Sequence, residues 1–373
     1  MRFLCLGLAI VGASCAQSET ATTDADVFAD AGPPFVWSTA TPESQGLSGA
    51  RLDAMQKTLA SHKTTGLLIL RNDQIVHEWY ASGWSASKTH YTASMAKALV
   101  GGVSTALALG DGRLALTDLA SIYVPQWKTG VHAPIRVWQL GTHTAGIEDS
   151  EPKDTPGWKS DFWARKSPPD DPFTLARDKA PVIATPGTKQ IYSNPSLAML
   201  SYVVTAALEG SPQPDLRTLL EQRVMQPIGV PDAEWNVGYN QTFTLDGLPM
   251  VPCWGGGNFT ARAAARVGRL MLRQGSWDGQ QLIPASAVQA VTGAHPQAPA
   301  GAFAPGIGWW SNATGWLSLP RDTFAGLGAG HQVLLVVPSL NLIVVRHGGD
   351  LASDFDQAIE DYLARPLMAA LLP

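Results

Sequence analysis

The chain has 373 residues, of which 45% are hydrophobic and 15% are charged. This composition is ordinary for a globular protein and supplies enough apolar side chains for a large core. The formal net charge of -5, without any basic run, argues against nucleic acid as a partner, because phosphate binding needs a concentrated positive surface.

Residues 1–16 are typical of a secretory signal peptide. A short charged start precedes an apolar stretch over residues 3–13, which is too short to cross a bilayer as a mature helix. Two cleavage schemes are open. One is ordinary cleavage before Gln17, and the other is a lipoprotein-type site that leaves Cys15 as a lipidated first residue. The sequence therefore predicts an exported bacterial protein that is periplasmic or anchored to the outer membrane, with that lipid as its one membrane contact.

Residues 17–34 are rich in Ala, Thr and Asp and lack apolar periodicity, so we expect a disordered tether there. Residues 35–373 form the predicted folded domain. Cys253 is the one cysteine outside the export segment, so no intrachain disulfide is expected in the mature chain. A small buried side chain is the favoured interpretation of Cys253, over a nucleophile.

The predicted elements place strands at both ends of the domain. After a helix over residues 48–59, two strands at 66–71 and 74–81 form a hairpin. Short strands return near the end, at 306–311, 333–337 and 342–345, and a last helix covers about 354–370.

The region from about 94 to 294 is mostly helical. Helices are expected at 95–109, 197–208, 216–224 and 261–272. Residues 151–172 are too polar and too broken for a regular element. This order predicts a mixed α/β fold of the α+β type, in which N- and C-terminal segments build one antiparallel sheet flanked by helices, with the helical region inserted.

Several common catalytic motifs are missing from the sequence. It has no G-x-S-x-G, no Walker motif and no G-x-G-x-x-G. His77 and Glu78 begin a metalloprotease-like pair, but Ala81 stands where the second histidine is needed. Because the histidines are scattered singly, we expect neither a metal nor a cofactor.

The motif S-x-x-K occurs three times, beginning at Ser85, Ser94 and Ser150. A serine hydroxyl is a poor nucleophile without a base, and residues i and i+3 of a helix lie on the same face. A lysine removed from water can act as that base. Only Ser94 opens a sustained apolar helix, so we predict Ser94 as nucleophile and Lys97 as base. A plain helix N-cap is the alternative interpretation of Ser94.

Further motifs give the chain a resemblance to the class C β-lactamase-like serine hydrolases. The S-x-x-K at Ser94 and the Tyr192-Ser-Asn194 segment match that superfamily's S-x-x-K and Y-x-N pair. Segments 140–147, 186–194 and 255–262 are similar to its connecting segments, although Arg262 and Ala263 depart from the last. The resemblance covers about residue 42 to the C-terminus.

The resemblance implies the serine β-lactamase/DD-peptidase fold and an acyl-enzyme on Ser94. Tyr192 would then share proton transfer, and Asn194 would orient Lys97 or a substrate carbonyl. The superfamily includes DD-peptidases, family VIII carboxylesterases and 6-aminohexanoate-dimer hydrolases. His143, in the first connecting segment, is expected to brace a loop.

The family's third motif, K-T-G, is where this sequence departs. The corresponding stretch over residues 323–332 has no lysine to bind an antibiotic's carboxylate, which argues against β-lactam hydrolysis. Its backbone near Ala325 or Gly326 is expected to supply an oxyanion N–H together with that of Ser94. The pattern here is most similar to the 6-aminohexanoate-dimer hydrolases and the esterases.

The chain has 13 tryptophans. We expect Trp254 and Trp310 to line an aromatic substrate pocket, with Trp158, Trp163 and Trp309 as further candidates, and the alternative is ordinary core filling. The sequence therefore predicts a monomeric serine esterase or amidase acting on a small-molecule ester or amide. A DD-peptidase or β-lactam-hydrolysing or -binding enzyme is one alternative, and a catalytically silent binding protein on the same fold is the other.

Overall fold

The computed structural model describes residues 35–299, 304–313 and 315–373. The predicted signal peptide and tether lie outside these residues and stay predictions. Contacts group residues 37–373 into one compact unit, and all elements below belong to it. Within the described ranges no helix is both long and apolar enough to span a membrane.

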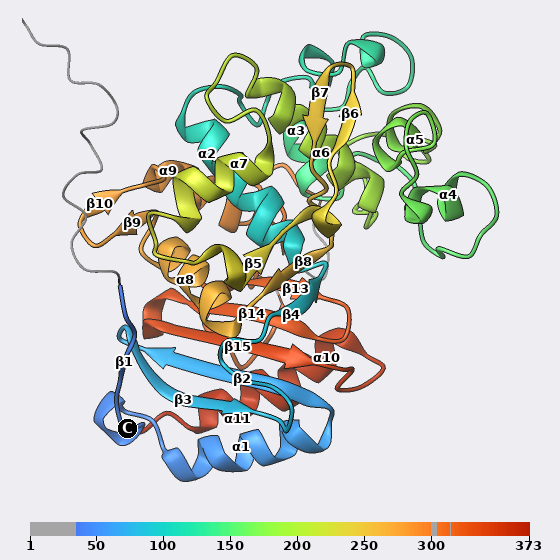
Figure 1. Cartoon of the computed structure of the whole chain (residues 1–373). Helices are drawn as coiled ribbons and strands as arrows, with labels where there is room; N and C mark the ends of the chain where they lie inside the picture. The colour runs from blue at the N-terminus through green and yellow to red at the C-terminus, as the bar shows by residue number, and fades with distance from the viewer. Residues whose placement is uncertain (1–34, 300–303, 314) are drawn as a thin grey trace, which may run out of the picture. The chain divides into compact units, whose positions relative to one another are not determined.

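An eight-stranded sheet joins the two ends of this unit, in the order β1-β3-β2-β15-β14-β13-β12-β11 (Figure 1). β1 runs parallel to β3, and the other neighbours are antiparallel. The strands are β1 (Ser38–Thr39), β2 (Thr64–Arg71), β3 (Gln74–Tyr80), β11 (Ala304–Pro305), β12 (Trp310–Ser311), β13 (Phe324–Gly328), β14 (Gln332–Val337) and β15 (Leu342–Gly348). The predicted fold, an antiparallel sheet built from N- and C-terminal segments, is confirmed.

Helices cover both faces of this sheet, which explains why its central strands are continuous apolar runs. On one face lie α1 (Gly49–Ser61), α10 (Phe355–Ile359) and α11 (Arg365–Ala369). α1 begins where the Ser48 side chain accepts the Arg51 N–H. On the other face α8 (Ala261–Leu272) contacts β14 and β15. Gly268 permits this approach, since a Cβ there would lie 3.0 Å from the Leu334 side chain.

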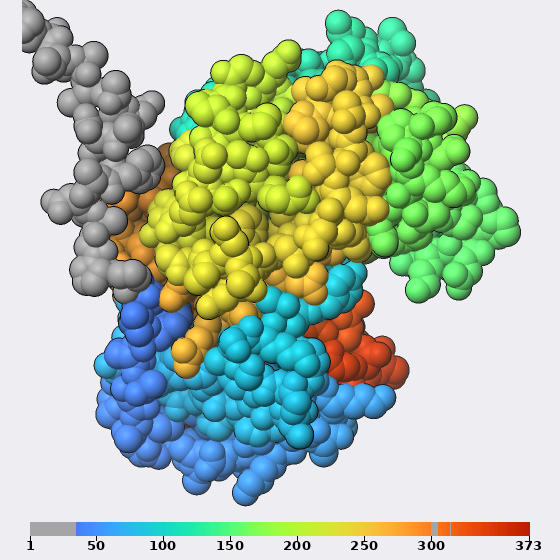
Figure 2. All heavy atoms as spheres, in the orientation of Figure 1, coloured from blue at the N-terminus to red at the C-terminus, as the bar shows by residue number. Residues whose placement is uncertain are grey.

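The chain between β4 and β11 forms the helical region, which covers the upper part of the face seen in Figure 2. The π-helical segment η3 (Lys97–Gly102) continues into α2 (Val103–Gly110) and begins this region. The other helices are α3 (Val137–Gly141), α4 (Trp158–Ala164), α5 (Pro172–Asp178), α6 (Asn194–Ala207), α7 (Leu216–Leu220) with η6 (Glu221–Met225), and α9 (Ala285–Thr292).

Two features of the helical region differ from the prediction. α4 lies inside the 151–172 stretch that was expected to be irregular, because its Phe162 is fully buried against Trp254 with 5.0 Å between ring centroids. A small sheet also joins β4 (His90–Ala93), β8 (Gly257–Phe259) and β5 (Trp235–Asn236). The hairpin of β6 (Phe243–Leu245) and β7 (Leu248–Met250) and the pair β9 (Ser276–Trp277) and β10 (Gln280–Gln281) complete the strands.

Candidate active site

Ser94 lies in the turn between β4 and η3. β4 ends at Ala93, whose φ of 47° is in the left-handed region, and the Ser94 carbonyl then accepts the Lys97 N–H at 2.9 Å. Ser94 is partly exposed whereas the residues on both sides of it are buried. The turn therefore presents one hydroxyl to solvent from an otherwise closed surface.

Lys97 is 2% exposed and lies directly behind Ser94. Its Nζ is 3.0 Å from Ser94 Oγ, 2.8 Å from Asn194 Oδ1 and 2.7 Å from the carbonyl oxygen of Trp254. The amide and carbonyl oxygens can only accept hydrogen bonds. A neutral amine has two N–H donors for these two oxygens, and its lone pair then faces the Ser94 hydroxyl. The geometry thus fits an amine that can receive the Ser94 proton.

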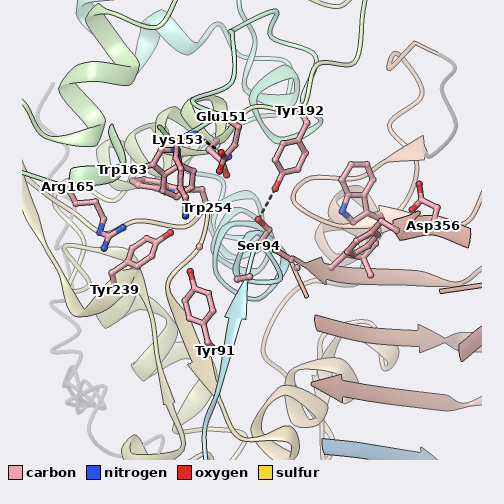
Figure 3. Close-up of a pocket in the computed structure, with 18 residues that line it drawn as sticks. Tyr91, Ser94, Glu151, Lys153, Trp163, Arg165, Tyr192, Tyr239, Trp254 and Asp356 are labelled. Carbon is pink, nitrogen blue, oxygen red and sulfur yellow. Dashed lines mark hydrogen bonds between the residues drawn. The ribbon is translucent and has the colours of Figure 1, made fainter. Parts of the chain in front are cut away.

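Tyr192 contacts Ser94 from the open side, as Figure 3 shows. Its hydroxyl donates to Ser94 Oγ at 2.8 Å, and the side chain is 37% exposed. Lys97 Nζ lies 4.8 Å from the centroid of the tyrosine ring. Ser94 Oγ therefore has contacts with two proton-carrying groups at once.

His143 braces the segment that carries Tyr192. Its ring stacks on Tyr192 with 4.5 Å between centroids, and its Nδ1 accepts the Ser193 N–H at 3.1 Å. Burial, with the positive charge of Lys97 as a second cause, lowers the pKa of His143 to about 3. The imidazole is therefore neutral at pH 7, which fits a structural role.

Asn194 is the first residue of α6 and is oriented by Asp149. Asp149 Oδ1 accepts hydrogen bonds from the Asn194 backbone N–H at 2.8 Å and from Nδ2 at 3.0 Å. With Nδ2 held in this way, Oδ1 of Asn194 points to Lys97. Sequence reasoning missed Asp149, because no motif or spacing distinguishes it from other loop carboxylates.

The edge of β13 approaches Ser94 from the sheet. A Cβ at Gly328 would lie 2.2 Å from the Thr92 carbonyl oxygen and 3.0 Å from the backbone N of Ser94, so only glycine fits there. The Asn312 N–H donates to the Thr323 carbonyl at 2.8 Å, so the backbone N–H and C=O of residue 323 face β12. Because this direction alternates along an antiparallel strand, the backbone groups of residues 325, 327 and 329 point to the same side. Because β12 begins opposite residue 325, the N–H groups of residues 327 and 329 lie beyond it.

The predicted oxyanion residues lie elsewhere. Ala325 is fully buried and pairs with Trp310, and a Cβ at Gly326 would press on Ala98 at 2.9 Å. Neither lines the cavity, whereas Leu327, Gly328 and Ala329 do. The difference arises because β13 approaches the backbone of Ser94 at its last residue, Gly328, just before the hairpin with β14.

A cavity of about 750 Å³ opens over Ser94. Its wall includes the predicted Trp254 and Trp310, together with Trp163. The Trp254 side chain is 1% exposed and packs on Phe162. Its role at the site is mainly that of its backbone carbonyl, which accepts a hydrogen bond from Lys97. The residues around the cavity are Tyr91, Ala93, Ser94, Glu151, Lys153, Trp163, Arg165, Tyr192, Asn194, Tyr239, Trp254, Gly255, Trp310, Leu327, Gly328, Ala329, Phe355 and Asp356.

Two other candidate chemistries have no site here. In the described part of the chain, no group of three or more His, Cys, Asp or Glu side chains is placed to hold a metal ion. Cys253 is fully buried, its Sγ lies 3.2 Å from the Leu197 carbonyl, and burial raises the pKa of its thiol to about 11. A thiol with such a pKa is protonated at pH 7 and is a structural side chain.

Two known proteins are similar in sequence to this chain. The 6-aminohexanoate-dimer hydrolase of Paenarthrobacter ureafaciens is 24% identical over 323 residues, covering 79% of this chain and 75% of the relative. A β-lactamase of Pseudomonas fluorescens is 27% identical over 220 residues, covering 56% of this chain and 53% of the relative. The chain therefore spans about half the length of that second relative.

A solved structure shares the fold. A Bacillus anthracis protein assigned to the 6-aminohexanoate-dimer hydrolases superposes with a TM-score of 0.68 at 20% identity, covering 91% of this chain and 89% of that one. The model of the Beta-lactamase family matches residues 52–368, which is most of the chain and includes all the residues around Ser94. The resemblance in the sequence motifs is thereby confirmed, and the chain belongs to the Beta-lactamase family.

Proposed function

We propose that this protein is an exported serine hydrolase that cleaves an ester or amide through an acyl-enzyme on Ser94. The observation that carries this proposal is the pair of contacts on Ser94 Oγ, from Lys97 Nζ at 3.0 Å and from the Tyr192 hydroxyl at 2.8 Å. One group can take the serine proton while the other holds a second proton close to the reacting atoms.

Acylation begins when Ser94 Oγ attacks the substrate carbonyl carbon and its proton passes to the neutral amine of Lys97. The carbonyl oxygen takes the electron pair, and the N–H groups of Ser94 and Ala329 stabilise its charge. The tetrahedral intermediate collapses as the bond to the leaving group breaks. That group takes a proton from Tyr192, which recovers one from the Lys97 ammonium.

Deacylation repeats these steps with water in place of Ser94. Water loses a proton toward Lys97 and Tyr192 and attacks the acyl carbon, and the bond to Ser94 Oγ breaks. Ser94 regains its proton, and the acid product leaves. The overall reaction consumes one water and leaves the enzyme unchanged.

Hydrolysis of β-lactam antibiotics is the weaker alternative. The strand that borders the nucleophile presents Leu327, Gly328 and Ala329 to the cavity, and none of these can bind a carboxylate by charge. The cations around the cavity are instead Lys153 and Arg165, which belong to the helical region. We therefore expect esters or amides without the β-lactam carboxylate geometry to be the better substrates.

The test is to incubate the purified protein with a fluorophosphonate probe and record its intact mass, with Ser94→Ala in parallel. Turnover of p-nitrophenyl butyrate, butyryl p-nitroanilide and nitrocefin is followed on the same samples. Probe mass on the wild type alone, with ester or anilide turnover, supports the proposal and separates esterase from amidase. Dominant nitrocefin turnover would favour a β-lactamase, and neither labelling nor turnover would favour a silent binding protein.

A further inference from the structure

One wall of the active-site cavity carries a cation that the reaction at Ser94 does not use. Arg165 follows the last residue of α4 and lines the cavity with Tyr239 and Trp163. In Figure 3 these three side chains lie on one side of Ser94, and Asp356 lies on the other. The cavity therefore has a defined charged end.

The guanidinium of Arg165 is held in place by neutral partners. Its Cζ lies 4.1 Å from the centroid of the Tyr239 ring, and its Nε donates to Gln241 Oε1 at 3.1 Å. Tyr239 is itself fixed, since a Cβ at Gly255 would lie 2.5 Å from its hydroxyl and one at Gly256 would lie 2.3 Å from its ring. A guanidinium stacked in this way keeps its terminal N–H groups available for a carboxylate.

No carboxylate of the described residues neutralises Arg165, although its neighbours are paired. Lys159 binds Glu148 at 2.9 Å, and Lys166 binds Asp161 at 2.9 Å. The chain as a whole has a net charge of -5, so an unpaired cation that faces a cavity stands out against its surroundings.

The other charges at this end of the cavity leave it net positive. Lys153 and Glu151 line the same wall and belong to one loop, in which Glu151 Oε2 accepts the Lys153 backbone N–H at 2.8 Å. Their charges offset one another, and the charge of Arg165 remains. Tyr91 adds a neutral hydroxyl to this wall.

Aromatic side chains cover the wall on the Arg165 side of Ser94. In Figure 3, Trp163 and Tyr239 are grouped there with partly exposed side chains, whereas the neighbouring Trp254 is 1% exposed. Such a surface favours an apolar segment of the substrate, and the guanidinium at its end favours an anion. We infer that the substrate carries a carboxylate separated from the scissile ester or amide by an apolar segment, and that Arg165 binds this carboxylate. This inference rests on the proposed function.

Binding tests the inference without any turnover. Hexanoate and hexan-1-ol, which share an apolar chain, are titrated by calorimetry into the wild type and into Arg165→Gln. The matched control is Lys166→Gln, which removes the adjacent but paired cation. We expect the wild type and the control to bind hexanoate about 10-fold more tightly than the alcohol, the effect expected of one charge-assisted hydrogen-bonded contact. Arg165→Gln should lose this preference and keep its affinity for the alcohol.

Equal hexanoate affinity in the wild type and Arg165→Gln would overturn the inference. If Arg165→Gln binds neither hexanoate nor hexan-1-ol, the same two titrations are repeated with Arg165→Lys. Retention of the hexanoate preference by that variant supports a charge-based contact, and its loss together with intact alcohol binding argues against one.

Kinetics then show which part of the substrate carries the charge. One pair compares mono-p-nitrophenyl adipate with p-nitrophenyl hexanoate, and the other compares the butyryl ester of 4-hydroxybenzoate with phenyl butyrate. In one pair the carboxylated ester should have a kcat/KM about 10- to 100-fold higher, and Arg165→Gln should abolish that advantage. If neither pair shows an advantage, the carboxylate site is refuted while the hydrolase proposal stands. If neither ester nor anilide is turned over and the fluorophosphonate does not label Ser94, the hydrolase proposal fails and the binding result alone decides on the site.

Discussion

Two buried cations allow the catalytic region and the sheet to be compared directly. Lys97 is 2% exposed beneath the cavity, and Arg346 of β15 is fully buried beside the β13–β14 hairpin. Neither has a carboxylate as its hydrogen-bond partner. Arg346 has five N–H donors and five oxygen acceptors: Thr64 Oγ1 at 3.0 Å and the carbonyl oxygens of His62 at 3.3 Å, Gly330 at 2.6 Å, His331 at 2.8 Å and Gly349 at 2.7 Å.

The comparison teaches that the charged group, and not its set of acceptors, separates the two sites, since each side chain contacts amide or carbonyl oxygens and one hydroxyl, but a guanidinium does not deprotonate whereas an amine can. Burial lowers the pKa of Arg346 to about 10, so it stays charged at pH 7, and every donor is used. Lys97 has two obligate acceptors, and its third partner, the Ser94 hydroxyl, can also donate. Ser94 Oγ is therefore the one of these three partners that can also donate a hydrogen bond to Lys97.

The largest expected effect comes from replacing the reactive cation with a permanent one. Lys97→Arg places a permanent cation beside Ser94 that cannot accept the Ser94 proton, because arginine does not deprotonate in proteins. Ester turnover and the rate of fluorophosphonate labelling should fall by about 10³-fold or more. Arg346→Lys is the control and should label within about 10-fold of the wild type. Labelling of Lys97→Arg at the wild-type rate would show that Lys97 is not the base.

Removing the structural cation should instead lower stability. Arg346→Met leaves the carbonyl groups of Gly330 and His331 without their buried donor, which should reduce the free energy of unfolding by about 3 kcal/mol. Urea unfolding measures this change. Arg223→Met is the control, because its ion pair with Asp111 is partly exposed and contributes less than about 1 kcal/mol. A change below 1 kcal/mol for Arg346→Met would contradict the structural assignment.

The two cations also differ in how far the sequence reveals them. The contact between Lys97 and Ser94 lies three residues apart on one helical turn, so the S-x-x-K spacing predicts it. The acceptors of Arg346 come from residues 62–64, 330–331 and 349, and only the folded sheet brings these together. Asp149 and Arg165 were missed for the same reason.

The fold was predictable where a pattern repeats over several turns or residues. α8 has the predicted bounds, 261–272, because its apolar face repeats at helical spacing. The strands β4, β5 and β8 have two to four residues each, too few to show alternation, and they were not predicted. The oxyanion donor was placed at Ala325 or Gly326, because sequence alone does not show where β13 approaches the backbone of Ser94.

A smaller effect is expected from the residue that orients the partner of Lys97. Asp149→Asn keeps the size of the side chain but replaces the carboxylate that fixes the Asn194 amide. We expect kcat for p-nitrophenyl butyrate to fall by about 10-fold with KM unchanged, as for the loss of one charge-assisted hydrogen bond. Asp154→Asn, an exposed position in the adjacent loop, is the control. An unchanged kcat in Asp149→Asn would mean that Lys97 holds Asn194 without help.

The last effect appears only in acid and concerns the buried histidine that accompanies each cation. Burial, then the charge of Lys97, lowers the pKa of His143 to about 3, and burial, then His90 and Arg346, holds the pKa of His347 well below 6.5. In the unfolded chain both protonate near pH 6.5, whereas the folded imidazoles stay neutral. Their contribution to stability is therefore complete above pH 6.5 and is lost as the pH falls toward the folded pKa, by about 1.4 kcal/mol per pH unit for each histidine.

Urea unfolding at pH 7, 6, 5 and 4 separates the two regions. Below pH 6.5 the free energy of unfolding decreases as the pH decreases. His143→Gln and His347→Gln should each reduce that slope by the contribution of one histidine, about 1.4 kcal/mol per pH unit. His143→Gln should also lower activity at pH 7. The glutamine Oε1 can still accept the Ser193 N–H, but Tyr192 loses the ring that stacks on it, so we expect the lower activity to come from a less well positioned Tyr192. His347 does not line the cavity over Ser94, so a glutamine there should change the slope alone. A slope identical to that of the wild type in both variants would show that neither imidazole is held neutral, and that acid opens the structure elsewhere.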